Sequence, residues 1–157
     1  LNIGSVRLTE RFFHGDPPTH PELEKAIEIV ENELARAGRF PFAGTTLIGV
    51  AGTATSLAIL DQGLHAFRLS AVRGYALELE HVYELFRKLR SMPAADIRKI
   101  SAVMEGRADV MTAGALILRE IMAHFRFQTM TVSERGVRYG LVLREWERQN
   151  PGEPPPS

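Results

Sequence analysis

Cysteine is absent from this chain of 157 residues. Its absence excludes a disulfide framework, thiolate metal sites and a cysteine nucleophile, and it is compatible with a reducing cytoplasm, where we expect the protein to reside. An excess of one charge is also lacking, because 19 lysine and arginine residues balance 19 aspartate and glutamate residues. The charge therefore gives no indication of a nucleic-acid or membrane partner, and a polyanionic ligand must be bound locally.

Long hydrophobic runs are missing as well. No stretch approaches the roughly 20 apolar residues that span a bilayer, and no basic-then-apolar leader precedes the first elements, so we expect a soluble protein. The five histidines lack metal-ligand spacing, which argues against a structural zinc site. The apolar content of 45% is enough for the core of one domain. The chain opens on Leu1 rather than methionine, which suggests an excised fragment.

Hydrophobic periodicity and turn residues predict strands alternating with helices. We expect strands over residues 1–8, 46–51 and 127–132, the second of them buried on both faces. Helices are expected from a capping box at Thr19 to Gly38, after the turn at Gly52, over 79–89, from Pro93, over 107–126 and over 139–149. The pattern indicates an α/β fold with parallel pairing, in which three strands form an incomplete sheet whose edge needs a partner. Residues 1–149 form the predicted domain, and the proline-rich residues 150–157 a disordered tail.

The most informative motif is the strand–glycine–helix junction at Gly52. A glycine at the carboxyl end of a parallel strand lets the backbone approach an anion, and the following helix offers free N–H groups. Thr53, Thr55 and Ser56 add hydroxyl groups suited to a phosphate oxygen. The motif is not a P-loop, because no lysine follows the glycine, nor a dinucleotide fingerprint, because the third glycine is missing. A purely structural turn, with Thr53 as a helix N-cap, remains open.

Arginines supply the other candidate contacts. Arg107 stands at the start of the long helix, where its charge opposes the helix dipole and indicates an anionic partner, although a surface ion pair with Asp109 or Glu105 is the alternative. Arg135 and Arg138 follow the third strand, at the edge where α/β sheets bind ligands, and are weaker candidates because exposed arginines are often only solvated.

Four blocks in order carry a family resemblance: residues 4–10 with 16–18, residues 50–56, residues 106–110 with 114–115, and residues 132–141. Together they resemble the exopolyphosphatase/guanosine-pentaphosphate phosphatase (Ppx/GppA) family. The resemblance implies the ribonuclease-H-like fold of the actin, hexokinase and heat-shock-protein superfamily, with two lobes closing on a phosphate-binding cleft. This chain corresponds to most of the second, C-terminal lobe, so its expected partners are the N-terminal lobe and a second copy in a homodimer.

The same resemblance implies an activity. Members remove the terminal phosphate of inorganic polyphosphate, or convert guanosine pentaphosphate to tetraphosphate, with magnesium and with a water activated by a glutamate of the first lobe. That glutamate should lie upstream of Leu1, so the fragment alone is expected to be inactive. Gly52, Thr53 and Arg107 carry over as phosphate contacts. Two alternatives stay open: a module that binds guanosine polyphosphates or assembles without catalysis, and a lobe of a sugar or acetate kinase, which fits the later blocks less well.

Overall fold

The computed structural model describes residues 1–38 and 44–154, and it has the α/β architecture that the sequence predicts. In chain order the elements are α1 (Ser5–Phe12), α2 (His20–Arg36), β1 (Leu47–Val50), α3 (Ala51–Asp61), α4 (Leu69–Val72), β2 (Ala76–Glu78), α5 (Leu79–Leu89), α6 (Ala94–Ile100), the 3-10 turn η1 (Ala102–Met104), α7 (Ala108–His124), β3 (Thr129–Ser133) and α8 (Val137–Gln149). Among the described helices, none has both the length and the apolar character needed to cross a bilayer. The predicted tail, residues 150–157, falls partly outside the described residues.

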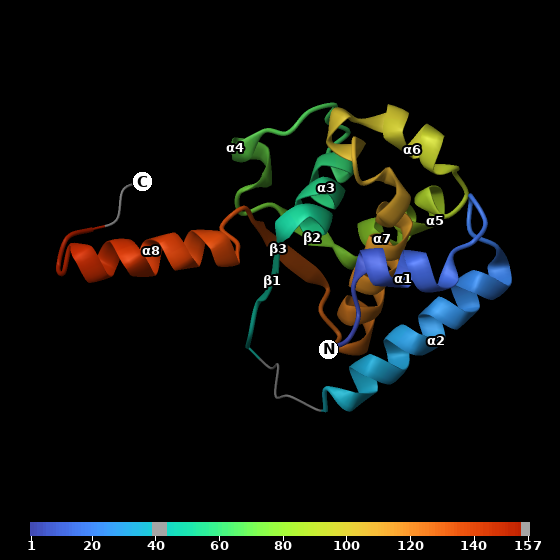
Figure 1. The fold of residues 1–157 in the computed structure, drawn as a ribbon, viewed down its shortest axis with the longest axis horizontal. Coiled ribbons are helices and arrows are strands. Elements are labelled where there is room, and N and C mark those ends of the chain that lie inside the picture. The colour runs from blue at the N-terminus through green and yellow to red at the C-terminus, as the bar shows by residue number, and fades with distance from the viewer. Residues whose placement is uncertain (39–43, 155–157) are drawn as a thin grey trace.

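β3 is the central strand of a three-stranded mixed sheet with the order β1-β3-β2 (Figure 1). β1 runs parallel to β3, with Val50 opposite Ser133, which confirms the predicted parallel pairing. β2 runs antiparallel to β3, with Leu77 opposite Met130, and the sequence did not predict it. Its three residues lead directly into α5, too short a stretch for strand alternation to show.

The sheet is buried on one face only. Leu77, Met130 and Val132 point into the core and are fully or almost fully buried. Ile48 and Val50 point to the opposite face, where they are 60% and 41% exposed. The prediction that the strand at 46–51 is buried on both faces is therefore wrong. Its apolar run is continuous, but β1 is an edge strand, and its outer side chains remain open to solvent.

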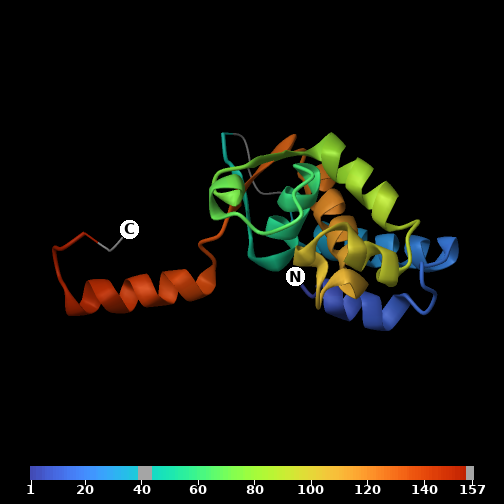
Figure 2. The same ribbon diagram turned by 90° about the horizontal axis from the view of Figure 1, so that it is seen from above.

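α7 is the central helix of the core, as the sequence predicts. It packs against α1, α2, α3 and α5 (Figures 1 and 2) and buries Met111, Leu116 and Met122. Three small residues in its middle, at 113–115, let the neighbouring elements approach closely. The apolar side chains that this helix buries contribute to the single hydrophobic core that holds the elements together.

The strand predicted over residues 1–8 does not form: residues 1–4 have no regular secondary structure, and the chain from Ser5 onward belongs to helix α1. Leu8 is buried, and Phe12, one helical turn later, packs against the core, while Arg7 and Arg11 remain exposed. This four-residue spacing is helical. The apolar residues at 1, 3, 6 and 8 resemble a strand only if the segment is read without the residues that follow, and contact with α7 and α2 favours the helix.

The capping box predicted at the start of α2 is confirmed. The Glu22 carboxylate accepts hydrogen bonds from the Thr19 backbone N–H at 2.7 Å and from the Thr19 hydroxyl at 2.8 Å. It also accepts one from the His14 backbone N–H at 2.8 Å, so it fixes the preceding loop as well as the helix end. These bonds, that from the Thr19 backbone most of all, lower the pKa of Glu22 to about 2.

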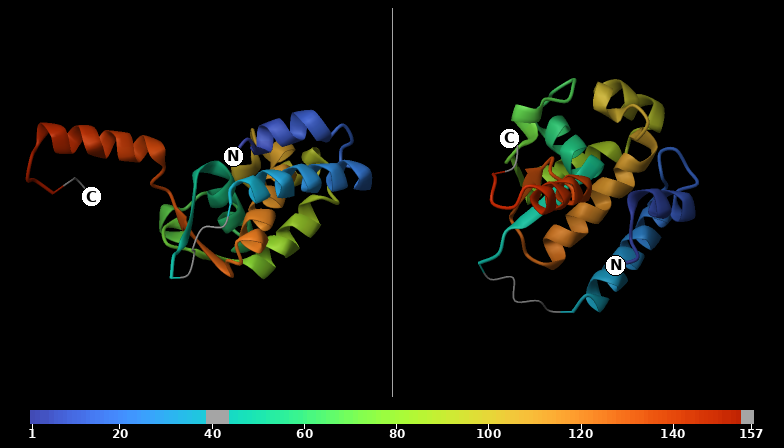
Figure 3. Two further views of the ribbon diagram at one scale, coloured as in Figure 1. Left: turned by 90° about the horizontal axis from the view of Figure 1, so that it is seen from below. Right: turned by 60° about the vertical axis from the view of Figure 1, so that its left-hand side comes forward.

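α8 projects from the rest of the molecule, and none of its residues is buried (Figures 2 and 3). The closing helix predicted over 139–149 is thus confirmed as a helix, beginning two residues earlier. Val137 and Val142 are 78% and 70% exposed, and Leu141 is also exposed. A helix gains most of its stability in proteins by packing an apolar face, yet none of the described elements covers these side chains of α8.

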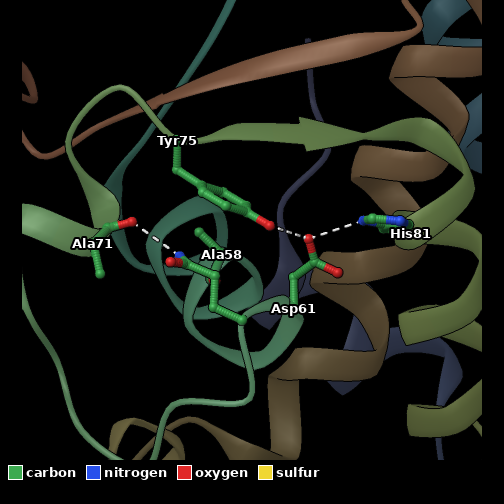
Figure 4. A network of polar contacts seen from close by, with 6 residues as sticks. Ala58, Asp61, Ala71, Tyr75 and His81 are labelled. Carbon is green, nitrogen blue, oxygen red and sulfur yellow. Dashed lines mark hydrogen bonds and ion pairs between the residues drawn. The ribbon is translucent and has the colours of Figure 1, made fainter.

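Asp61, at the end of α3, connects this helix to Tyr75, the residue just before β2, and to His81 in α5 (Figure 4). Its Oδ2 accepts a hydrogen bond from the Tyr75 hydroxyl at 2.6 Å and lies 3.1 Å from His81 Nδ1. Burial, followed by the bond to Asp61, raises the pKa of Tyr75 to about 12. The hydrogen bond and the charge of Asp61 raise the pKa of His81. The cluster therefore contains a protonated phenol, a carboxylate and, at mildly acidic pH, an imidazolium.

His81 is expected to make stability depend on pH. Because its pKa is higher in the folded state, its contribution is fully present below the unfolded-state pKa of about 6.5 and is lost as pH rises through the folded value. The melting temperature of the wild-type protein should exceed that of His81→Gln by more at pH 5.5 than at pH 8.5. Thermal melts at both pH values test this, with His14→Gln as the control, because His14 is exposed and forms no ion pair with any described residue. Equal differences at the two pH values would refute it.

Candidate functional site

The junction between β1 and α3 is abrupt: the strand ends at Val50 and the helix begins at the next residue. Ala51 has a backbone φ of 68°, in the left-handed region that non-glycine residues rarely adopt. The N–H groups of the first helical turn have no partner within the helix. Because β1 and β3 are parallel, this turn lies at the same edge of the sheet as the end of β3.

Arg107 lies across this turn. Its Nη1 donates hydrogen bonds to the Gly52 carbonyl at 3.1 Å and to Ser56 Oγ at 3.0 Å, so it joins the start of α7 to the first turn of α3. A Cβ added to Gly52 would lie 2.6 Å from this nitrogen, so a larger residue here would displace the end of the Arg107 side chain from its present position. Among the described residues, neither Asp109 nor Glu105 forms an ion pair with Arg107, which removes the simple alternative explanation for its charge.

A cavity of about 430 Å³ opens beside the guanidinium. It brings together four of the seven residues that the sequence singles out, together with an aromatic residue and two carboxylates, and its lining consists of Ala51, Gly52, Thr55, Ser56, Phe67, Ala102, Val103, Glu105, Arg107 and Glu134. Thr55 Oγ1 donates to the Ala51 and Gly52 carbonyls at 3.1 and 3.2 Å. The volume lies within the range typical of small-molecule sites. The Arg107 guanidinium suits an anionic group, whereas the Thr55 hydroxyl proton is already donated to backbone carbonyls.

Thr53 is not part of the cavity lining. Its side chain faces α7, and a Cβ added to Gly114 would lie 2.7 Å from Thr53 Cγ2 and 3.1 Å from its Oγ1. The structure thus gives Thr53 a packing contact between α3 and α7. Its backbone N–H still belongs to the first turn of α3.

Arg135 and Arg138 also lie outside the cavity lining. The Arg135 guanidinium lies over the Tyr139 ring, 4.8 Å from its centroid, and 3.7 Å from the Glu134 carboxylate. Arg138 is exposed on the first turn of α8. Any contact of these two arginines with a ligand at the cavity would require the ligand to extend toward α8.

Glu134 and Phe67 line the cavity although the sequence did not single them out. Glu134 follows β3 and pairs with Arg73 at 2.7 Å. A bond from its own backbone N–H, and then Arg73, lower its pKa. Its place after a strand that ends beside β1 was a usable signal. Phe67 had no such signal in the sequence, because its loop is held against η1 by a tertiary contact, the 2.8 Å bond from the Ala102 N–H to the His65 carbonyl.

Metal-ligating side chains do not cluster here. Within residues 1–38 and 44–154 there is no group of three or more histidine, cysteine, aspartate or glutamate side chains placed to hold a metal ion. These residues therefore offer no complete site for the magnesium ion that the resemblance implies.

The fold and the cavity define an α/β lobe that presents polar groups at the carboxyl ends of parallel strands, the edge where such folds bind their ligands. A match to a protein-family model identifies the chain more specifically. The chain belongs to the Ppx/GppA phosphatase family, whose model matches residues 1–149.

Individual proteins of known sequence also resemble this chain. Exopolyphosphatase 2 of Mycobacterium tuberculosis is 33% identical over 148 residues, which cover 90% of this chain and 46% of that protein. The bifunctional 3-dehydroquinate synthase/phosphatase of Fusobacterium nucleatum is 30% identical over 155 residues, or 95% of this chain and 23% of that protein.

Solved structures show the same relationship. The crystal structure of the Aquifex aeolicus member of the Ppx/GppA family matches with a TM-score of 0.87 and 30% identity, covering 96% of this chain and 48% of that one. An exopolyphosphatase-like protein matches with a TM-score of 0.88 and 32% identity, covering 95% and 50%. The chain therefore spans about half the length of these structures and of the mycobacterial relative.

Proposed function

We propose that the chain is the C-terminal, ribonuclease-H-like lobe of a hydrolase that releases the terminal phosphate of inorganic polyphosphate or guanosine pentaphosphate. One observation carries the proposal: the Arg107 guanidinium is fixed over the first turn of α3, beside a polar cavity and free of any carboxylate partner among the described residues. Family membership and the exopolyphosphatase names of several relatives support it.

The proposed task of the cavity is to hold and neutralise phosphate oxygens. Arg107 has donors beyond the Nη1 that bonds Gly52 and Ser56, and the first turn of α3 adds backbone N–H groups. Phosphoryl transfer depends mainly on positioning and charge stabilisation, which such groups supply. We propose that magnesium arrives with the phosphate chain, since it commonly binds through substrate phosphates and only one or two carboxylates.

The proposed partner of the chain is the remaining half that its relatives possess. Two surfaces fit a large partner: the open face of β1, where Ile48 and Val50 are exposed, and the projecting helix α8 with Val137 and Val142. Burying both together would remove a sizeable apolar area from water. The cavity and both surfaces lie next to the ends of β1 and β3. The remaining half of the protein, docked on these surfaces, would therefore face the cavity.

The test compares phosphate release by this chain with release by a chimera. In the chimera, the chain is fused to the part of exopolyphosphatase 2 that does not align with this chain. We expect no release of phosphate from polyphosphate or guanosine pentaphosphate by the chain alone, and release by the chimera. Turnover by the chain alone at the rate of the chimera would show that the catalytic groups lie within these 157 residues.

A second candidate is an assembly module without catalysis, which the exposed apolar side chains of α8 favour. It predicts that the chain forms a stable homodimer in sedimentation experiments and that Val142→Glu dissociates this dimer. It also predicts that the chimera is inactive. An active chimera would rule it out.

A further inference from the structure

Ser56 lines the cavity beside Arg107 yet is almost fully buried, with 2% of its surface exposed. A hydroxyl group withdrawn this far from solvent needs a hydrogen-bond partner inside the protein. The Ser56 Oγ has this partner in Arg107 Nη1, which donates to it at 3.0 Å. Its position therefore suits contact with the arginine better than contact with a ligand in the open cavity.

Gly52 and Ser56 present two acceptors to the same nitrogen atom. They are four positions apart in α3, so they lie on one face of the helix, one turn above the other. Arg107 Nη1 donates to the Gly52 carbonyl at 3.1 Å as well as to the Ser56 hydroxyl. A terminal guanidinium nitrogen carries two N–H groups, so both donors of Nη1 are used within the protein.

Three donors of the Arg107 guanidinium remain, one on Nε and two on Nη2. Among the described residues, none accepts a hydrogen bond from these two nitrogens, and no carboxylate pairs with Arg107. The guanidinium is planar and rigid, so two bonds at Nη1 also fix the direction of the edge formed by Nε and Nη2. Such an edge can bind an oxyanion through two parallel hydrogen bonds.

We propose that Ser56 is a positioning residue, whose hydroxyl holds the Nε and Nη2 edge of Arg107 ready for a phosphate group and does not itself touch the ligand. The inference rests on the proposed function, because it takes Arg107 as a phosphate contact. A long side chain loses rotamer freedom when it binds a ligand, and an anchor that has already fixed it lowers this cost. Ser56 thus raises the affinity for phosphate through Arg107.

The experiment measures the affinity for inorganic triphosphate by calorimetric titration of the wild-type chain, Ser56→Ala, Arg107→Ala and the double variant. We expect Ser56→Ala to weaken binding about three- to tenfold, the factor that ordering one long side chain costs. In the Arg107→Ala background the same substitution should change the affinity less than about twofold, because no guanidinium is left to position.

Thr112→Val is the matched control. It removes a hydroxyl group that is as deeply buried, in a residue 3% exposed, and that is bonded to the Leu89 carbonyl at 3.3 Å. Thr112 does not line the cavity, so this variant should bind triphosphate as the wild type does.

An NMR measurement without ligand tests the anchor itself. The order parameter of the Arg107 Nε–H bond should fall in Ser56→Ala and stay unchanged in Thr112→Val. If Ser56 only contributes to packing, Ser56→Ala lowers the melting temperature and leaves this order parameter unchanged, which would overturn the inference.

The outcomes separate this inference from the proposed function. Wild-type affinity in Ser56→Ala, together with a loss in Arg107→Ala, would overturn the role of Ser56 while the phosphate site stands. An equal loss from Ser56→Ala with and without Arg107 would show that the hydroxyl contacts the ligand directly, which also contradicts a positioning role. Absence of triphosphate binding by the wild type would overturn the phosphate site and the role of Ser56 together.

Discussion

Replacing Arg107 with alanine is expected to weaken the binding of inorganic triphosphate by about 10- to 100-fold. A hydrogen bond to a charged group contributes about 1.5–3 kcal/mol, and each 1.4 kcal/mol is a factor of about ten in affinity. Among the described residues that line the cavity, Arg107 is the only arginine or lysine, so its removal leaves the unpaired Glu105 carboxylate to repel the ligand. NMR or calorimetric titration of the wild type and the variant measures the ratio.

The matched control is Arg138→Ala, which removes the same charge from an exposed position outside the cavity lining. It should change the affinity less than about twofold in 0.15 M salt, where distant surface charges are largely screened. Arg107→Lys should recover only part of the affinity, because a lysine lacks the planar fork that reaches both Gly52 and a ligand. Equal losses in Arg107→Ala and Arg138→Ala would mean that only net charge matters and that the site is elsewhere.

Gly114→Ala is expected to lower the free energy of unfolding by about 2 kcal/mol, through overpacking between α7 and α3. The added Cβ would lie 2.7 Å from Thr53 Cγ2, an atom on a stiff β-branched side chain. For a chain of this size the melting temperature should fall by roughly 4–8 °C. Chemical denaturation followed by circular dichroism provides the measurement.

Two further variants make this prediction specific. Thr53→Ala in the Gly114→Ala background removes the clashing methyl group and should restore most of the lost stability. Gly140→Ala, in the exposed helix α8, meets no atom within 4 Å and should not lower the stability, because alanine is the better helix former. Loss of triphosphate binding in Thr53→Ala alone, at unchanged stability, would instead assign Thr53 a direct ligand contact that the packing does not show.

Local signals in the sequence located most of the elements. The capping box at Thr19 and Glu22, the apolar spacing of α5 and the small residues of α7 act over a few residues of the chain. Short segments were harder to assign from such local signals. Residues 1–8 favour a strand until Phe12 supplies the helical spacing, and Ala76–Glu78 becomes a strand only because β3 offers it an edge.

The site, too, contains features that the sequence indicated and features that only the structure revealed. Gly52 and Arg107 stood out because each is unusual for its local position: a glycine at a strand–helix junction and a cation at a helix N-terminus. Their direct contact, 55 positions apart in the chain, could not be derived from either motif. Thr53 fits the motif as well as Thr55 does, yet the orientation of α3 against α7 turns it toward Gly114.

The sequence by itself determined the order of the main helices, the parallel strand pair, the glycine turn and the four motif blocks that identify the family, because these depend on local spacing and residue type. The tertiary structure alone decided which side chains share one cavity. It brought Phe67, Glu105 and Glu134 to the Arg107 guanidinium, and it left Ile48 and α8 exposed. The physical reason is that packing joins residues distant in the chain, and that the buried side of an element depends on what is present to cover it.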